Sequence, residues 1–280
     1  MSRTIECFYP GRGFPSISVT GAECSLDCKH CSRKYLEGMI PATTPEELLD
    51  VAEALAERGA RGFLLSGGVD GTGKIPLKGF VPAISEIKSS TDLKINVHVG
   101  LAPRAELESL LSSGIDSFSV DLYGSDETIR EVSGLDAKSD DYFKVFETLQ
   151  QLGASVSPHL CVGIHAGQLK GEASVISRLR QLEPKTLILI SLIPTKGTQY
   201  AFMKPPSREM MLSITSEARA ELPGAKLLLG CMRSKTDRSW ESALVDAGLD
   251  GIVLPAQNTV ESLRAKGYSV RKRSVCCALI

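Results

Sequence analysis

Residues 21–34, GAECSLDCKHCSRK, place Cys24, Cys28 and Cys31 in a C-x3-C-x2-C spacing. Thiolates select zinc, copper(I) or iron–sulfur clusters. Structural zinc normally takes four ligands from paired half-sites, which this stretch does not supply. Three thiolates on a cubane cluster leave one iron open, which suits a cluster that binds and reduces a ligand. The stretch therefore predicts a catalytic 4Fe-4S cluster, with a structural zinc knuckle or three unrelated thiols as the alternatives.

The composition is that of an ordinary globular protein. The chain has 280 residues, of which 42% are hydrophobic and 23% charged, and its formal net charge is −1. These values give no reason to expect nucleic acid or a membrane surface as a partner. The first ten residues lack the apolar core of a signal peptide, and no apolar run approaches the ~20 residues of a spanning helix. We therefore expect a cytoplasmic protein whose cysteines are ligands rather than disulfides.

Short apolar strands alternate with amphipathic helices along the whole chain. Helix boundaries are marked by caps such as Thr44 before Pro45, and by glycines that follow the helices in ERGARGF and SSGIDSF. Strands are predicted at residues 16–19, 63–65, 95–99, 118–122, 156–162, 187–192, 226–229 and 252–254. Alternation of this kind implies a parallel sheet with right-handed crossovers.

Eight such units would close an α/β barrel of the TIM type, (β/α)8, whereas six would leave a partial barrel. We favour the full barrel, over residues 15–267. An N-terminal arm at residues 1–14 and a C-terminal tail at residues 268–280 would lie over the active-site face. That face is formed by the loops at the carboxyl ends of the strands. The cysteine loop, residues 21–34, follows the first predicted strand and therefore lies on this face.

Further candidate residues follow other predicted strands. They are Ser66, Gly67 and Gly68 after the second strand, Asp121 in the fourth, and Gly163 and Ile164 after the fifth. Each has an ordinary interpretation as well. Glycines after a strand commonly only turn the chain, and a loop carboxylate commonly caps a helix. His159, Cys161 and His165 alternate along the fifth strand and beyond it, and an inward histidine is most often a core residue.

The cysteine spacing, with His30 just before the last cysteine, resembles the signature of the radical SAM superfamily. The segments LLSGG, HVGL, DETIREV, SPHLCVGIHAGQ and LGCMRS and the final Cys-Cys extend this resemblance over nearly the whole chain. They are similar to the biotin synthase-related radical SAM proteins, a group that includes the two-component lipoyl synthases. The resemblance implies that S-adenosylmethionine chelates the open iron and that its reductive cleavage yields a 5′-deoxyadenosyl radical.

The resemblance also implies a cofactor site around the strand ends. Ser66, Gly67 and Gly68 would meet the methionine amine of S-adenosylmethionine through the backbone. Asp121 would accept hydrogen bonds from the ribose hydroxyls. Gly163 and Ile164 would lay an apolar side chain against the adenine. His30 would be the remaining cofactor-binding residue.

The other cysteines predict an auxiliary iron–sulfur cluster. Cys231 ends the seventh predicted strand, Cys276 and Cys277 end the chain, and Cys7 lies in the N-terminal arm. In sulfur-inserting radical SAM enzymes such a cluster gives up sulfide to a substrate carbon radical. The alternative is that Cys7 and Cys161 are small buried hydrophobes and that the tail pair is disordered. The N-terminal C-x4-C-x5-C motif of single-chain lipoyl synthase is absent from the sequence.

By this resemblance we expect a sulfurtransferase that inserts sulfur into an octanoyl chain, as one component of a two-protein lipoyl synthase. Its partners would be an octanoylated lipoyl domain or glycine-cleavage carrier protein, a related second radical SAM protein, and a reductant such as ferredoxin or flavodoxin. Arg271, Lys272 and Arg273 would meet the acidic surface of the carrier. The alternative is a biotin synthase-like enzyme, or a radical SAM methylase or rearrangement catalyst, with a single 4Fe-4S cluster.

Overall fold

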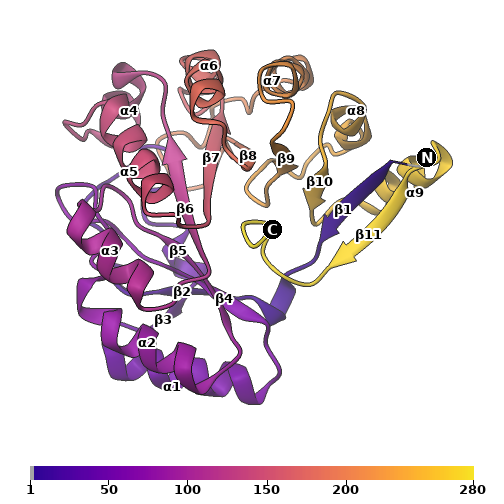
Figure 1. Cartoon of the computed structure of the whole chain (residues 1–280). Helices are drawn as coiled ribbons and strands as arrows, with labels where there is room; N and C mark the ends of the chain where they lie inside the picture. The colour runs from indigo at the N-terminus through magenta and orange to yellow at the C-terminus, as the bar shows by residue number, and fades with distance from the viewer. Residues whose placement is uncertain (1–2) are drawn as a thin grey trace.

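The computed structural model describes residues 3–280, so the first two residues of the predicted N-terminal arm lie outside it. In the described residues, eleven parallel strands form one curved, open sheet with helices on its convex face (Figure 1). The strand order is β11-β1-β10-β9-β8-β7-β6-β5-β4-β2-β3. Within the same residues, no helix is long and apolar enough to cross a membrane.

The strands differ in length, and the longest lie in the middle of the sheet. They are β1 (Thr4–Phe8), β2 (Ser16–Ser18), β3 (Ile40–Pro41), β4 (Gly62–Ser66), β5 (Lys94–His98), β6 (Ser117–Leu122), β7 (Val156–Val162), β8 (Thr186–Ser191), β9 (Lys226–Leu229), β10 (Gly251–Val253) and β11 (Ser269–Arg273).

Helices connect most of the consecutive strands, as a parallel sheet requires. They are α1 (Pro45–Glu57), α2 (Val81–Ser90), α3 (Arg104–Ser112), α4 (Asp126–Ser133), α5 (Ser139–Gln151), α6 (Glu172–Leu182), α7 (Arg208–Glu221), α8 (Glu241–Asp246) and α9 (Gln257–Ala265). The predicted cap of α1 is present, because the Thr44 hydroxyl accepts a hydrogen bond from the Glu47 amide at 3.2 Å.

All eight predicted strands are present, as β2 and β4 to β10. The barrel is open, because β10 pairs with β1 rather than with β2. The partial form of the predicted barrel is therefore the one found, in place of the closed form. Two strands that the sequence did not predict, β1 and β11, extend the sheet beyond β10.

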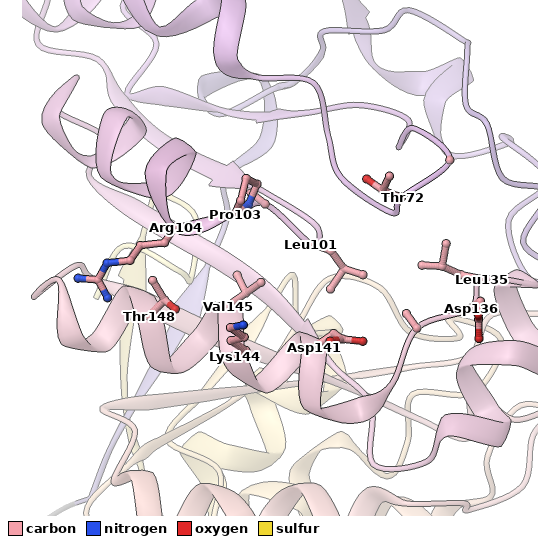
Figure 2. A pocket seen from close by; sticks show the side chains of 13 residues that line it. Thr72, Leu101, Pro103, Arg104, Leu135, Asp136, Asp141, Lys144, Val145 and Thr148 are labelled. Atoms are coloured by element: carbon pink, nitrogen blue, oxygen red, sulfur yellow. The ribbon is translucent and has the colours of Figure 1, made fainter.

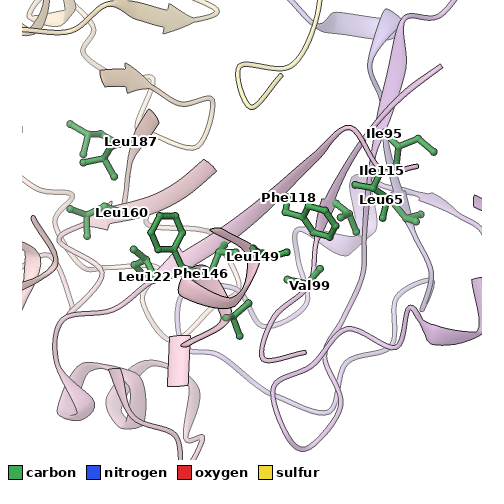
Figure 3. Packing of buried hydrophobic residues seen from close by; sticks show 14 of the residues in the cluster. Leu65, Ile95, Val99, Ile115, Phe118, Leu122, Phe146, Leu149, Leu160 and Leu187 are labelled. Carbon is green, nitrogen blue, oxygen red and sulfur yellow. The ribbon is translucent and has the colours of Figure 1, made fainter. Parts of the chain in front are cut away.

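The hydrophobic core lies between the convex face of the sheet and the helices. Phe118 and Leu122 of β6 pack there with Phe146 and Leu149 of α5, and all four side chains are almost fully buried (Figure 3). Burying a side chain of this size stabilises the fold by about 1.5–3 kcal/mol. Because alternate strand residues point to opposite faces, this packing leaves the intervening residues of each strand facing the barrel interior.

The interior has two chemically different sides. The polar wall comprises inward residues of β5, β6 and β7: Asn96, His98, Ser117, Ser119, Asp121, Ser157, His159 and Cys161. The apolar wall comprises residues of β8, β9, β10 and β1: Ile188, Ile190, Leu228, Val253 and Phe8. The end of the chain turns into the concave face and packs between the two walls (Figure 1).

Candidate active site

The cysteine loop leaves the carboxyl end of β2 and is held by the loop that follows β4. The Ser25 amide donates to the Val69 carbonyl oxygen at 2.8 Å, and the Val69 amide donates to Cys24 Sγ at 3.4 Å. The loop after β4 therefore positions Cys24.

The three thiols of the cysteine loop lie close enough to influence one another. Burial raises the pKa of Cys28 to about 12, and the charges of Cys31 and Cys24 add to this effect. Burial also raises the pKa of Cys31, against backbone hydrogen bonds from Tyr35 and Arg33 that lower it. A bound metal deprotonates the thiols that coordinate it. The three thiols can therefore all be thiolates when a cationic centre lies between them.

The spacing of these thiols suits a cluster better than a single ion. Across residues 3–280, no three histidine, cysteine, aspartate or glutamate side chains are grouped to hold one metal ion. Structural zinc needs four ligands on one ion, so the zinc alternative has no support in this part of the chain. A cubane spreads its thiolates over different irons and tolerates wider spacing.

The glycines after β4 approach the cysteine loop closely. The Gly68 amide donates to the Thr20 hydroxyl at 2.7 Å, and this hydroxyl donates to the Glu23 carbonyl oxygen at 2.8 Å. A side chain at Gly68 would place its Cβ 2.6 Å from the Cβ of Cys24. Glycine is required here because two backbones meet, and not only because the chain turns. The adjacent Ser66 is buried, at 8% exposure.

His30 has an unused hydrogen-bonding atom inside the cysteine loop. Its Nδ1 is buried and has no partner among the described residues. Burial lowers the pKa of His30 to about 4, although the charge of Asp121 opposes this shift. A buried, unpaired nitrogen next to Cys31 fits a ligand that brings its own polar atoms. Together with the thiols and the glycine contact, it supports a 4Fe-4S cluster held by Cys24, Cys28 and Cys31.

Asp121 occupies the centre of the carboxyl face. It is exposed at the end of β6, and its charge acts on His98 and His159 of the polar wall as well as on His30. Burial lowers the pKa of His98, and burial together with His98 lowers the pKa of His159 to about 4. The rings of His98 and His159 lie 5.7 Å apart. Both imidazoles are therefore neutral at pH 7, while the exposed carboxylate above them can accept hydrogen bonds.

Gly163 and Ile164 lie at the end of β7, but their side of the site is filled by protein. Gly163 has a φ of 72°, and its amide donates to Glu172 Oε1 at 2.8 Å. Ile164 is only 7% exposed and packs with Val132 and Leu192. Little of the Ile164 side chain is therefore left to contact an adenine ring.

A second set of thiols comprises Cys276 and Cys277, which pack inside the barrel, and Cys231, which is exposed just after β9. The Cys276 and Cys277 side chains are hydrogen-bonded to each other. Protein atoms around the Cys231 sulfur raise its pKa, and the charge of Cys276 adds to this effect. The Asn96 amide of the polar wall donates to Cys276 Sγ at 3.9 Å. We call these three cysteines the second thiol group.

Cys7 does not belong to the second thiol group. It lies in β1 with its side chain among the residues of the outer core, where it is fully buried. Its neighbour Phe8 faces the interior and contacts the apolar cluster of Cys277. Alternation along β1 therefore separates Cys7 from the other three cysteines. Burial raises the pKa of Cys7 to about 11, as expected for a thiol that packs as a hydrophobe.

A buried ion pair supports the loop that carries Cys231. Arg233 and Glu241 are each 1% exposed, and Arg233 Nη2 lies 2.6 Å from Glu241 Oε1. Arg233 also donates to the carbonyl oxygen of Leu254, at the end of β10, at 3.4 Å. The pair thus ties the loop after β9 to the loop after β10, which fixes the position of Cys231.

A cavity of about 620 Å³ lies beside the cysteine loop, between the loops after β4 and β5 and helix α5 (Figure 2). Leu101 and Leu135 line it and also belong to the hydrophobic cluster against which Leu26 of the cysteine loop packs. No predicted site residue among those described lines this cavity. It is therefore adjacent to the site and separate from it.

Two of the basic tail residues are engaged within the chain. Arg273 donates to Glu6 Oε1 at 2.7 Å, and Arg271 lies 3.8 Å from the same oxygen. Lys272 lies over the ring of Tyr9, 5.9 Å from its centroid. The single carboxylate of Glu6 is thus shared by two of the three basic tail residues, and Arg271 remains 60% exposed.

Several residues of the polar wall were not predicted from the sequence. Asn96 and His98 alternate along β5, and Ser117 and Ser119 alternate along β6, next to them in the sheet. The signal was present, because polar residues at every second position of a buried strand share one face. Their importance depends on the neighbouring strands, which only the fold reveals.

An open parallel α/β barrel with three cysteines on the first loop of its carboxyl face defines the radical SAM class. The sequence pattern of the radical SAM superfamily matches residues 18–167, which is more than half of the chain. The chain belongs to the radical SAM superfamily. As a member, it takes a 4Fe-4S cluster and S-adenosylmethionine.

Among characterised relatives, the chain is similar to biotin synthases. It is 22% identical to the biotin synthase of Parabacteroides distasonis over 88% of this chain and 77% of that protein. It is 25% identical to the biotin synthase of Helicobacter hepaticus over 85% of this chain and 84% of that protein. The protein is therefore a radical SAM enzyme related to biotin synthase.

Solved structures share the fold over nearly the whole chain. HydG, a maturase of the [FeFe]-hydrogenase, superposes with a TM-score of 0.68 at 14% identity, over 99% of this chain and 66% of HydG. Methylornithine synthase (PylB) superposes with a TM-score of 0.65 at 16% identity, over 98% of this chain and 84% of that enzyme. These likenesses concern the fold alone.

Proposed function

We propose that the protein is a sulfurtransferase that inserts sulfur into the octanoyl chain on a lipoyl-type carrier protein. The proposal is carried by the second thiol group, which comprises Cys276 and Cys277 inside a radical SAM barrel and Cys231 just after β9. When bound, a 4Fe-4S cluster on the cysteine loop supplies the electron that cleaves S-adenosylmethionine, and an auxiliary cluster on the second thiol group supplies sulfur.

The residues between the two thiol groups have defined tasks. Asp121 accepts hydrogen bonds from the ribose hydroxyls of S-adenosylmethionine, for which its exposed position at the end of β6 is suited. His98 and His159 remain neutral, so they add no charge to the interior. The Asn96 amide, which donates to Cys276 Sγ, orients this thiol toward the polar wall.

We further propose that the protein works as one half of a two-protein lipoyl synthase. A related radical SAM protein would add the other sulfur, and a ferredoxin or flavodoxin would supply electrons. This division is supported by the resemblance of the whole chain to the group that includes two-component lipoyl synthases.

A second candidate is a biotin synthase-like activity on a small molecule. The polar wall favours it, because the half-buried imidazoles of His98 and His159 and the exposed side chain of Asp121 can form hydrogen bonds with a polar substrate. An octanoyl chain would use few of these groups. The named relatives are biotin synthases, which also supports this candidate.

The test is anaerobic turnover with a defined substrate. Reconstituted protein is incubated with reductant, S-adenosylmethionine and an octanoylated lipoyl domain, alone and with a candidate partner protein. Mass spectrometry is expected to find one added sulfur with this protein alone and two with its partner. A parallel incubation with dethiobiotin tests the second candidate. Sulfur on dethiobiotin and none on the octanoyl chain would replace the first proposal with the second.

Iron analysis distinguishes both from a radical SAM methylase or rearrangement catalyst. Two cubanes correspond to about eight irons per chain and one cubane to about four. A content of about four irons in fully reconstituted protein would leave no auxiliary cluster and would contradict sulfur insertion.

A further inference from the structure

The exposed large hydrophobic side chains of the described residues gather on two adjoining loops. Leu169 lies in the loop after β7, and Phe202 and Met203 lie in the loop after β8. Phe202 is 97% exposed, whereas Leu169 and Met203 are each 39% exposed. The two loops are in contact, because a Cβ at Gly163 would lie 3.1 Å from the Pro206 ring. Exposed apolar side chains gathered on adjoining loops commonly mark a binding site.

These loops also border the cysteine loop. The Tyr200 amide donates to the Lys29 carbonyl oxygen at 2.9 Å, and the Tyr35 hydroxyl lies 3.0 Å from Thr195 Oγ1. The exposed apolar residues therefore lie on the rim of the carboxyl face, beside the predicted cluster. A macromolecule bound to them would be next to the mouth of the barrel.

The surroundings of the apolar residues are basic. Residues 192–208 contain Lys196, Lys204 and Arg208 and no acidic residue, and residues 163–171 contain no acidic residue either. Lys29 pairs with Glu131 on α4, which neutralises it. In the part of the chain that the structure describes, Lys196 and Lys204 have no carboxylate within ion-pair distance, nor does Arg33 of the cysteine loop. Three cations without an ion-pair partner thus lie on the loop after β8 and on the cysteine loop that it contacts.

We propose that this rim patch, Leu169, Phe202 and Met203 with Arg33, Lys196 and Lys204, is the docking surface for an acidic carrier protein domain. The inference rests on the proposed function and names the surface that receives its protein substrate. The uncompensated cations complement an acidic partner, and the aromatic ring of Phe202 provides the apolar anchor that binding hot spots require. The rim patch offers cations that no carboxylate pairs, whereas Arg271 and Arg273 share the carboxylate of Glu6.

The experiment compares a protein substrate with a small one. Turnover is measured with an octanoylated lipoyl domain and with a short octanoylated lysine peptide, which cannot contact the rim. Phe202→Asp is expected to lower kcat/KM for the domain about 30-fold, the size of a hot spot, and to leave the peptide within twofold. Lys204→Glu is expected to lower the domain value about fivefold at low salt, with a smaller effect at 300 mM salt because the charges are screened.

Lys185→Glu is the matched control, because it makes the same charge change at an exposed site before β8, at the opposite end of the sheet. It should leave both substrates unchanged. Unchanged turnover of the domain by Phe202→Asp would overturn the docking surface. A wild-type protein that converts neither substrate would contradict the proposed function, and the rim patch would then be tested by binding of the domain alone. Absence of Phe202-dependent binding, or self-association through Phe202 seen by sedimentation, would overturn it.

Discussion

The two thiol groups of the molecule are built in opposite ways. Cys24, Cys28 and Cys31 lie within one loop, whose backbone is fixed by contacts with the loop after β4. Cys231 and Cys276 are 45 residues apart in the sequence and meet only because the end of the chain turns into the barrel. The first group is a local motif, whereas the second is a product of the tertiary fold.

This difference means that the second thiol group depends on distant contacts in the fold, whereas the first does not. A local loop can retain its thiols near one another when distant parts of the chain move. The second group depends on the docking of the tail, which is held by the hydrogen bond from the Ser117 hydroxyl to the Ala278 carbonyl oxygen at 2.6 Å and by packing on the apolar wall. We therefore expect the two groups to be separable by mutation, each with its own chemical readout.

The largest effect is expected from Cys28→Ala. The variant removes one of the three thiolates that hold the cluster of the cysteine loop, and no neighbouring residue can take its place. Release of 5′-deoxyadenosine from S-adenosylmethionine should fall below detection in anaerobic assays with a strong reductant. Substantial deoxyadenosine release by Cys28→Ala would show that the cysteine loop is not the site of cleavage.

The second-largest effect is expected from Cys276→Ala, which separates the two thiol groups. Cys276→Ala should abolish the sulfur-containing product, because it removes a ligand of the proposed auxiliary cluster, while deoxyadenosine release stays within about threefold of wild type. Cys7→Ala is the matched control, since Cys7 is buried in the outer core, and it should retain both activities. If Cys7→Ala and Cys276→Ala lose sulfur insertion equally, the exclusion of Cys7 from the cluster ligands, which rests on the alternation of side chains along β1, is wrong.

Asp121→Ala tests where S-adenosylmethionine lies relative to the cysteine loop. Loss of hydrogen bonds to a charged group costs about 1.5–3 kcal/mol, so the Kd for S-adenosylmethionine should rise about 10- to 100-fold. Equilibrium binding to the reconstituted protein measures it. Asp136→Ala, in the cavity beside the cysteine loop, is the control. Weaker binding by Asp136→Ala alone would place the ligand in that cavity.

The smallest effect concerns the polar wall between the thiol groups. The pKa of His159 is lowered from 6.5 to about 4 in the folded protein, so the unfolded chain binds a proton at a higher pH than the folded one. The stability that neutral His159 provides is complete above pH 6.5 and is lost as the pH falls toward 4. His159→Gln should remove about 2 kcal/mol of this pH dependence, measured by denaturant unfolding. An identical slope in both proteins would mean that His159 is solvated.

Much of the fold follows from local signals in the sequence. Glycines such as Gly114 and Gly153 end helices in the left-handed conformation, and the eight predicted strands are present. The strands β1 and β11 could not be predicted, because their short polar and apolar mixtures, TIECF and SVRKR, become strands only by pairing with each other and with β10.

The candidate site, like the fold, has one part that local sequence predicts and one part that it does not. The cysteine spacing and the glycines after β4 predict a local cofactor loop, because their chemistry lies in adjacent residues. His98 begins the HVGL segment, but that segment assigns it no role, and its neighbours in the site come from β6 and β7. Cys7 resembled the other spare cysteines in the sequence, and only the pleat of β1 separates it from them. Spacing along the sequence does not predict which residues meet across the sheet.

The most direct test of two independent iron–sulfur sites is the iron and sulfide content of the variant in which Cys24, Cys28 and Cys31 are all replaced by alanine. Two sites predict about four irons per chain and an equal amount of sulfide after anaerobic reconstitution, held by Cys231, Cys276 and Cys277. Cluster-free protein from this variant would contradict the account, because the second thiol group would then bind no cluster of its own.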